Sequence, residues 1–516
     1  MFSFKKTLPE KVGIPSSCIK ELLLYLDKKG IPMHSLLIMR NDKLVLEKYY
    51  APYTADTLHR MFSISKSFTG LAISLLADEG KIDLDESITT YFPEYADINT
   101  HKWIKETTIR NMLMMRTCHA STTYKVDMTT NWTQSFFTVA PTHKPGTVFH
   151  YDTSAAHVLC ALVEKETGMD ILDYLKEKVL KYLDFSQESY MIKDPFGTSI
   201  GGSGLMALPM DILKVLYLIS KNGTVTCSDG VERTLINPDY IIEATSNLSD
   251  TVMTGPIPSE ACGYGMQIWK NEKNGFVMYG LGGQLAISIP QKDLLIVTTA
   301  DTQGMAGANQ VIYDAIYKML RYMNDTPVND ISDDNKSSYE AMMEVANFLE
   351  ISLPRIQNCS YKADSGELPG FIKDLASFTN YPNSSDEDPK DTAFVSLCYF
   401  LSDNPKGFDK LHLKLSAEGA STISLSGKTD SFNINFGFNK MQEGLFSKYN
   451  NPYTAGAVWL RENVLYIRVH LIGECVGSIA FELYFGEKDI TVFMKKIEET
   501  YFKEFDGHLY GVFEQN

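Results

Sequence analysis

The chain has 516 residues, of which 44% are hydrophobic and 22% charged, so it can bury large cores, and its length predicts two or three domains. Its formal net charge of −16 repels phosphate backbones and anionic lipids, which argues against nucleic-acid binding and against binding to a membrane surface. No segment has the roughly 18 uninterrupted apolar residues that span a bilayer, and the first ten residues lack the apolar run of a secretory signal, so we expect a cytoplasmic protein.

Cysteine and histidine spacing gives no sign of a metal site. The eight cysteines are scattered without a C-x-x-C pair, and the ten histidines are equally dispersed. We therefore expect mostly reduced thiols in the core, no structural metal and no cofactor.

The first part of the chain alternates between helical and strand patterns and predicts one mixed domain over residues 1–323. A helix is expected over 19–29, and the apolar runs 35–40 and 43–48 flank Asn41-Asp42, a turn pair that predicts a hairpin. Further strands are predicted at 275–278, 285–289 and 294–299, with helices filling most of the sequence between. The fold class is then α/β or α+β.

A polar, acidic and turn-rich stretch follows, which predicts a linker over residues 324–338. After a helical pattern near 339–350, apolar and polar residues alternate over 432–438 and 464–469, as in strands with one buried face. We therefore expect a separate β-rich domain over residues 339–516.

Ser63 and Lys66 form an S-x-x-K tetrad in the segment FSISKSFTG, residues 62–70. The apolar residues that follow have helical spacing, so Ser63 is expected in the first turn of a buried helix, on the same face as Lys66. A serine hydroxyl becomes a nucleophile when a neighbouring base takes its proton, and a partly desolvated lysine can be or support that base. The alternative is a capped helix whose lysine is exposed.

This segment resembles the nucleophile motif of the serine β-lactamases and penicillin-binding proteins, in particular the class C-like members. Four further segments resemble that family in the same order across about residues 8–320: 76–85, 108–117, 145–154 and 201–206. The resemblance implies an antiparallel sheet flanked by helices, with an all-helical subdomain. It covers the first predicted domain only.

The family's second catalytic element is a tyrosine that follows a Pro-Gly-Thr turn, and Tyr151 matches it here. A phenol close to Lys66 is expected to have a lowered pKa and to act as a base toward Ser63 and then as an acid toward the leaving group. The alternative is a tyrosine that only packs behind a turn. Thr153 stands where the family usually has asparagine, so it offers a substrate amide fewer hydrogen bonds.

The third element of the family is a basic residue, a small residue and glycine, on the strand beside the nucleophile. Met278-Tyr279-Gly280 matches it without gaps, so the basic residue is missing. The resemblance implies that Thr153, Tyr279 and Gly280 contact substrate and that the Leu281 N–H pairs with that of Ser63 as an oxyanion hole. Without the basic residue, recognition of the carboxylate that β-lactams and D-alanyl peptides carry is weaker.

These features predict a serine hydrolase that cleaves a small ester, an amide or a peptide through an acyl-enzyme on Ser63. β-Lactamase or D-alanyl-D-alanine carboxypeptidase activity is the first alternative, and a non-catalytic binding protein that keeps the scaffold is the second. The β-rich domain is open to a role as a lid or a subunit contact. Nothing in the sequence predicts the oligomeric state.

Overall fold

The structure is a computed structural model that describes residues 2–513 except 256, 325, 327, 329, 355–393, 417, 418, 462 and 500. Its contacts divide the chain into two compact units, Met1–Leu349 and Glu350–Asn516. This division lies after the linker predicted at 324–338, because the helix α13 (Asp333–Phe348) packs against α1 (Ser16–Lys28) of the first unit. Ser332 begins α13 with a capping box, a signal that the acidic composition of the stretch conceals.

The first unit is built on a seven-stranded sheet in the order β1-β3-β2-β12-β11-β10-β9. All neighbours are antiparallel except the short β1, which runs parallel to β3. The strands are β1 (Lys5–Lys6), β2 (Met33–Arg40), β3 (Lys43–Tyr49), β9 (Trp269–Lys270), β10 (Phe276–Gly280), β11 (Gln284–Ile289) and β12 (Leu294–Ala300).

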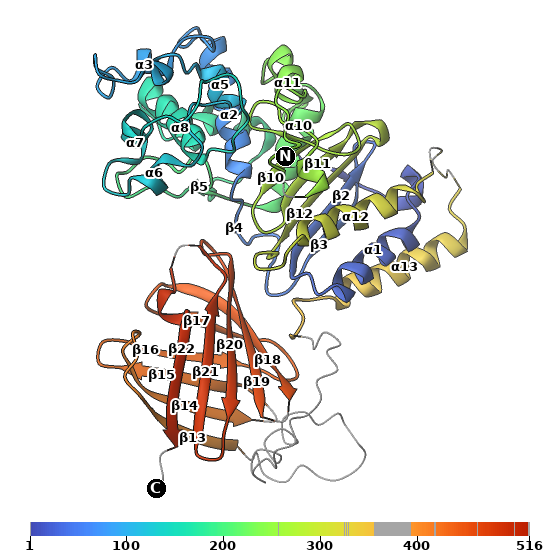
Figure 1. Cartoon of the computed structure of the whole chain (residues 1–516). Coiled ribbons are helices and arrows are strands. Elements are labelled where there is room, and N and C mark those ends of the chain that lie inside the picture. Colours follow the sequence, from blue (N-terminus) through green and yellow to red (C-terminus); the bar gives the residue numbers. More distant parts are fainter. Residues whose placement is uncertain are drawn as a thin grey trace. The chain divides into compact units, whose positions relative to one another are not determined.

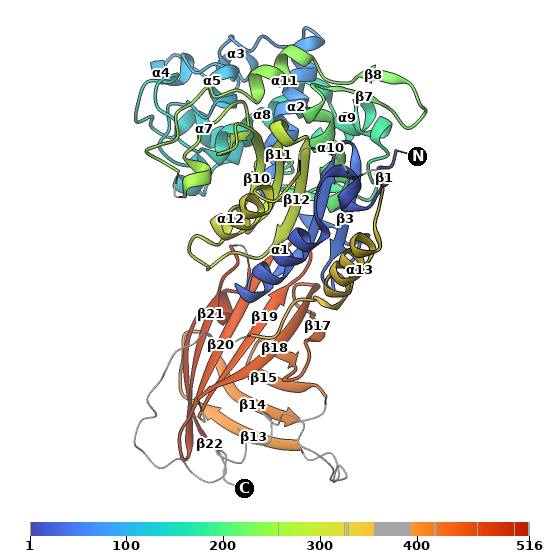
Figure 2. The same ribbon diagram turned by 90° about the vertical axis from the view of Figure 1, so that its right-hand side faces the viewer.

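The predicted hairpin is β2 and β3, closed by Asn41 and Asp42, which both have positive φ (48° and 58°) as a tight hairpin turn requires. Every residue of β2, β11 and β12 is buried, since both faces of the sheet are covered. The helices α1, α12 and α13 lie on one face, and α10 lies on the other (Figures 1 and 2). Besides α1 and α13, the helices of this unit outside the helical subdomain are η1 (Pro9–Val12), α10 (Pro209–Ser220), α11 (Pro238–Ala244), η3 (Pro258–Glu260), η4 (Pro290–Lys292) and α12 (Ala308–Leu320).

The helical subdomain occupies the chain between β4 (His59–Arg60) and β5 (Tyr190–Met191), as Figure 1 shows. It contains α2 (Ile64–Asp78), α3 (Ile88–Tyr91), α4 (Lys102–Lys105), α5 (Ile109–Leu113), α6 (Thr123–Val126), α7 (Trp132–Thr138), α8 (Thr153–Thr167), α9 (Ile171–Lys178) and η2 (Leu180–Leu183). The strands β4, β5 and β6 (Leu205–Ala207) form a small sheet in the order β4-β6-β5, and β7 (Thr224–Thr226) pairs with β8 (Glu232–Thr234). The small sheet matters for function because β4 leads directly to Ser63.

The second unit is one ten-stranded antiparallel sheet in the order β16-β15-β14-β13-β22-β21-β20-β19-β18-β17. Gly437, just after β16, exchanges backbone hydrogen bonds with Ala455 and Ala457 of β18, so the two ends of the sheet meet there. One face of the strands forms the core, as the alternating patterns predicted. The elements are β13 (Phe394–Leu401), β14 (Phe408–Ser416), β15 (Ser421–Gly427), β16 (Ser431–Phe436), β17 (Gln442–Phe446), β18 (Asn451–Arg461), β19 (Val464–Leu471), β20 (Gly477–Phe485), β21 (Asp489–Lys496), η5 (Lys503–Phe505) and β22 (Gly507–Phe513).

The predicted fold class, an α/β (α+β) domain with a helical subdomain followed by a β-rich domain, is confirmed. In the part of the chain that the structure describes, no helix is long and apolar enough to cross a membrane.

Candidate active site

A strained turn between β4 and α2 presents Ser63. Phe62, immediately before it, has φ of +46°, a conformation that costs a non-glycine residue about 1–3 kcal/mol and occurs mainly at functional sites. Two contacts hold the turn: the Ser65 hydroxyl donates to the Phe62 carbonyl at 2.5 Å, and the Leu205 N–H donates to that hydroxyl at 2.9 Å. Ser63 therefore begins α2 on a backbone that is anchored to β6.

Lys66 reaches Ser63 from the first turn of α2. The side chain is buried, with 1% of its surface exposed, and Nζ donates to Ser63 Oγ at 2.9 Å and to the Gly202 carbonyl at 2.8 Å. The same ammonium lies 4.7 Å from the centre of the Tyr151 ring. The alternative of an exposed lysine is therefore wrong, and the S-x-x-K spacing does place the two side chains in contact.

Tyr151 lies just before α8, with its ring between Lys66 and Trp269, whose ring centre is 5.4 Å away. Burial raises the pKa of the Tyr151 phenol well above its ordinary value, and interactions with Ser63 and Trp269 lower it by less. The expected lowering of this pKa by Lys66 is wrong, because the ammonium faces the ring and desolvation of the hydroxyl dominates. The resting phenol is neutral, so it is a hydrogen-bond and proton donor.

Asp152, between Tyr151 and Thr153, caps α8 and is fully buried. Its carboxylate accepts hydrogen bonds from the Ser154 N–H at 2.9 Å, from the Ser154 hydroxyl and from the Thr117 hydroxyl at 3.3 Å. Burial raises the pKa of Asp152 to about 6, and these hydrogen bonds lower it only in part. Asp152 therefore fixes the start of α8 and with it the backbone of the adjacent Tyr151.

We expect the Asp152→Asn variant to remove a pH dependence of stability. Because the folded-state pKa of about 6 lies above the ordinary value of 3.8, the folded protein binds more protons between those values, and stability falls as pH rises through that window. Between pH 4 and pH 7 the free energy of unfolding of the wild type should fall by about 2 kcal/mol relative to the variant. Urea unfolding at several pH values measures this difference, and a difference that does not change with pH would contradict it.

The end of β10 packs against the turn that carries Ser63. A Cβ added to Gly280 would lie 2.4 Å from the Met61 carbonyl oxygen, so glycine is needed for this approach. Met278 is fully buried, and the Tyr279 hydroxyl accepts a hydrogen bond from Asn309 of α12. Leu281, at the end of the strand, has an exposed side chain. The structure thus brings Gly280 close to the nucleophile turn, while the roles proposed for Tyr279 and for the Leu281 N–H stay predictions.

Thr153 and the Lys66 ammonium both lie close to Gly202. Thr153 Cγ2 would be 2.4 Å from a Cβ at Gly202, and Lys66 Nζ would be 3.7 Å from the same Cβ. Gly202 therefore fits between the two side chains only because it lacks a Cβ. Its segment was expected as a glycine-rich turn, but its carbonyl as a partner of Lys66 was missed, since backbone acceptors leave no mark in a sequence.

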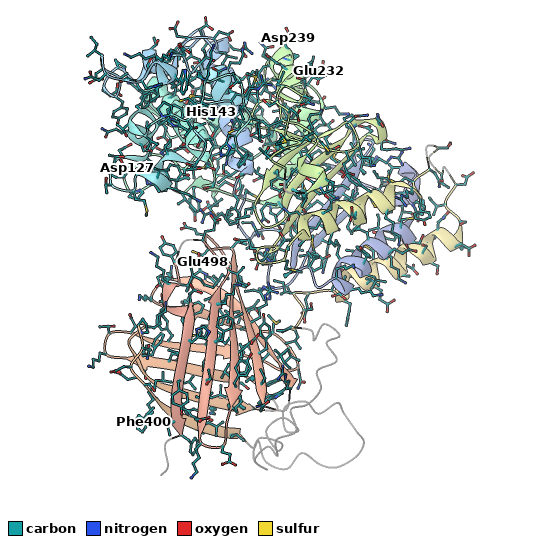
Figure 3. All side chains as sticks on the ribbon, in the orientation of Figure 1. Asp127, His143, Glu232, Asp239, Phe400 and Glu498 are labelled. Atoms are coloured by element: carbon teal, nitrogen blue, oxygen red, sulfur yellow. The ribbon has the colours of Figure 1, made fainter. Side chains whose placement is uncertain are left out.

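His119 and His143, which lie near these motifs in the sequence, form hydrogen bonds to groups other than Ser63. His119 is buried and bonds to the Phe136 carbonyl through Nε2 at 2.9 Å. His143, labelled on the helical subdomain in Figure 3, bonds to the Thr142 hydroxyl at 2.8 Å. Within the described residues, no group of three or more His, Cys, Asp or Glu side chains could hold a metal ion.

Comparison with protein families finds a match over most of the first unit. The beta-lactamase family model matches residues 19–318, more than half of the chain. The chain belongs to the beta-lactamase family. The matched range begins in α1 and ends in α12, so it covers the sheet except β1, the helical subdomain and every residue of the site described above.

Proteins that resemble the chain have diverse names. Protein flp of Staphylococcus aureus (strain MW2) is 29% identical over 199 residues, which cover 34% of this chain but only 40% of that protein. The 6-aminohexanoate-dimer hydrolase of Paenarthrobacter ureafaciens is 23% identical over 281 residues, which cover 51% of this chain and 71% of that enzyme. The octameric penicillin-binding protein homologue from Pyrococcus abyssi is 15% identical with a TM-score of 0.40, and the match covers 94% of this chain and 97% of that one.

Proposed function

We propose that this protein is a serine hydrolase that cleaves an ester or amide bond, including a peptide bond, through an acyl-enzyme on Ser63. The observation that carries the proposal is the contact of 2.9 Å between Lys66 Nζ and Ser63 Oγ, made by a lysine that is 1% exposed. A buried amine next to a hydroxyl is the arrangement that activates a serine without a histidine. The 6-aminohexanoate-dimer hydrolase among the relatives supports an amide as one substrate class.

In the proposed reaction the Lys66 ammonium first loses a proton to solvent, and the resulting amine takes the Ser63 proton while Oγ attacks the carbonyl carbon. The N–H groups of Ser63 and Leu281 stabilise the tetrahedral oxyanion, and Tyr151 donates its phenolic proton to the leaving group as the carbonyl re-forms. Lys66 then returns the proton to Tyr151. Water then attacks the acyl-enzyme, with the proton-transfer roles reversed. This step releases the acid and restores Ser63.

An extended acyl group has a place beside Ser63. β9 pairs with β10 only at Phe276 and Val277, so in the described part of the chain no strand covers the edge of β10 from Met278 to Gly280. Backbone groups on such an edge bind an extended chain by strand addition. This supports a peptide or an amino-acid derivative as substrate.

β-Lactamase or D-alanyl-D-alanine carboxypeptidase activity is the alternative substrate assignment. Both reactions involve a carboxylate near the scissile bond, and the buried Met278 stands where the family has the basic residue that attracts it. The net charge of −16 adds to this preference against anions. We therefore place these activities second. A non-catalytic binding protein is disfavoured because Ser63, Lys66 and Tyr151 remain in mutual contact.

The neutral state of Tyr151 predicts a leaving-group effect. In the Tyr151→Phe variant, kcat should fall at least about 100-fold for alkyl esters and amides, whose leaving groups need a proton, because general acids contribute about 10²–10⁴-fold. p-Nitrophenolate leaves without a proton, so p-nitrophenyl esters should lose much less. Steady-state kinetics with a methyl and a p-nitrophenyl ester of the same acid measure the contrast. Equal losses for both esters would show that the phenol acts before the leaving group departs.

The direct test of the proposed function is a hydrolysis screen with p-nitrophenyl esters, D-amino-acid amides and nitrocefin. We expect turnover of esters and amides and little or no opening of nitrocefin. Turnover of nitrocefin alone would favour the β-lactamase alternative. No turnover of any substrate, together with no labelling by a fluorophosphonate probe, would favour the non-catalytic one.

A further inference from the structure

A buried carboxyl group lies next to the strand on which the family has a basic residue. Met278 of β10 is fully buried and occupies the place of the basic residue. The next residue of β10, Tyr279, is bonded to Glu260 of η3, whose side chain is 7% exposed. A carboxylate is rarely buried without a partner, because desolvation disfavours its charged form. Nothing in the proposed reaction uses Glu260, so its burial calls for a reason.

A chain of hydrogen bonds ends on Glu260. The Thr302 hydroxyl donates to Asn309 Oδ1 at 2.6 Å, and Asn309 Nδ2 donates to the Tyr279 oxygen. Since the Tyr279 oxygen already accepts a bond, its own proton is free to point at the Glu260 carboxylate, to which the phenol is bonded. Each donor in the chain is thus aligned to stabilise a negative charge at Glu260.

The carboxylate keeps capacity for a ligand. An ionised carboxyl accepts about four hydrogen bonds, and the bond from Tyr279 uses one of these positions. Burial raises the pKa of Glu260 while the Tyr279 bond lowers it, and a group with this balance gains from the approach of a cation. η3 is held in place because the Ser259 N–H and hydroxyl both donate to Gln310 Oε1, at 3.1 and 3.0 Å.

Aromatic rings connect Glu260 to the reacting groups. The Tyr279 ring lies 6.0 Å from that of Trp269, and the Trp269 ring lies 5.4 Å from that of Tyr151. Burial raises the pKa of the Tyr151 phenol most, and a negative charge on Glu260 raises it further. The carboxylate is therefore within electrostatic reach of the bond that Ser63 attacks, in surroundings where water screens it little.

The two basic residues nearest Ser63 in the chain both bond to the 201–204 turn. Lys66 donates to the Gly202 carbonyl, and Arg60 Nε donates to the Ser203 carbonyl at 3.3 Å, with its guanidinium 4.9 Å from the centre of the Phe62 ring. The two basic side chains are therefore engaged at the 201–204 turn, whereas the carboxyl group of Glu260 is bonded to Tyr279 of β10. Because Tyr279 lies on the uncovered edge of β10 and is bonded to Glu260, we expect a substrate placed along this edge to lie near the carboxyl group.

We propose that Glu260 selects substrates that carry a cationic amine beside the scissile bond, such as amino-acid or peptide esters and amides with a free amino group, and disfavours carboxylates at that position. The inference rests on the proposed hydrolysis at Ser63 and adds its substrate charge. Glu260 acts here as a specificity-determining residue through its charge on the bound amine.

Three methyl esters of matched size test the charge selection. They are alanine methyl ester, in D and L forms, as the cation; N-acetylalanine methyl ester as the neutral compound; and monomethyl succinate as the anion. The wild type should show kcat/KM in the order cation, neutral, anion. In Glu260→Gln the ratio of kcat/KM for the cation over the neutral ester should fall about 10-fold, the effect of one partly buried charge pair.

Two controls separate charge recognition from a structural effect. Glu272→Gln makes the same change at an exposed glutamate and should leave the ratio within twofold. The wild-type preference for the cation should also disappear as pH rises through the amine pKa near 8, because the amine loses its charge there. A structural role for Glu260 does not produce this pH dependence.

The outcomes distinguish this inference from the hydrolase proposal. Turnover of the esters with a ratio that Glu260→Gln leaves unchanged overturns the charge selection and leaves the hydrolase intact. Turnover of none of the esters overturns the hydrolase itself. If Glu260→Gln fails to fold, the order of the three esters on the wild type decides, and a preference for monomethyl succinate overturns the inference.

Discussion

Replacing Ser63 with alanine is expected to lower kcat for ester substrates by about 10⁴-fold or more, the loss seen when a hydrolase loses its nucleophile. Lys66 Nζ contacts the Ser63 hydroxyl at 2.9 Å. The turn that presents this hydroxyl has a strained backbone conformation at Phe62. Alanine keeps that turn, because the bonds that fix it come from Ser65 and Leu205. The loss should therefore appear in kcat with little change in thermal stability.

Ser74→Ala is the matched control. Ser74 lies in the same helix, is 1% exposed, and its hydroxyl has no hydrogen-bond partner among the described residues. Removing that hydroxyl leaves no buried group unpaired, so activity and stability should stay near those of the wild type. If Ser63→Ala and Ser74→Ala had equal activity, Ser63 would not be the nucleophile.

Two substitutions of Lys66 should each lower kcat about 10³-fold or more, and together they separate a base from a fixed charge. Lys66→Met keeps much of the length of the side chain and removes the amine. Lys66→Arg keeps a positive charge in the pocket formed by the Gly202 carbonyl and the Tyr151 ring, but a guanidinium does not give up its proton. Because the proposed role of Lys66 is to accept the Ser63 proton, both variants should be inactive.

The kinetics of the arginine variant decide between the two roles. If Lys66 only supplied a charge that stabilises the oxyanion, Lys66→Arg would keep a tenth or more of the wild-type kcat. Labelling by a fluorophosphonate should slow in both variants and not only in Lys66→Met. Circular dichroism checks that each variant folds, since the larger guanidinium must fit into a site where the lysine is 1% exposed.

Local patterns predicted most of the fold. The hairpin of β2 and β3 follows from its two apolar runs and the Asn41-Asp42 turn, and β10, β11 and β12 also lie where apolar runs occur. The division between the units was placed too early because α13 has an acidic first turn and few apolar residues. Only its packing against α1 shows that it belongs to the first unit.

Some residues of the candidate site were also predictable from local patterns, and others were not. Ser63 and Lys66 are three residues apart on one helix, so helical geometry alone brings them together. Tyr151, Thr153 and Gly280 were placed by resemblance, and the structure brings them close to that pair or to its turn. The sign of the Tyr151 pKa shift could not be predicted, because it depends on how deeply the hydroxyl is buried.

Two groups escaped prediction for physical reasons. Gly202 acts through its carbonyl, which every residue has. Glu260 is a single glutamate in a short 3₁₀ helix, and its meaning comes from Tyr279 and Asn309, which are distant in the chain. Asp152, by contrast, carried a signal that was overlooked, since an aspartate immediately before an apolar helical run is a common N-cap.

The central claim, that Ser63 forms the covalent intermediate, is tested most directly by mapping a fluorophosphonate adduct. The protein is inactivated with the probe, digested, and analysed by mass spectrometry while the loss of ester turnover is followed in parallel. The account predicts one adduct, on the peptide that contains Ser63, whose amount equals the fraction of activity lost. Loss of activity with the adduct on a different residue, or full ester turnover after complete modification of Ser63, would contradict it.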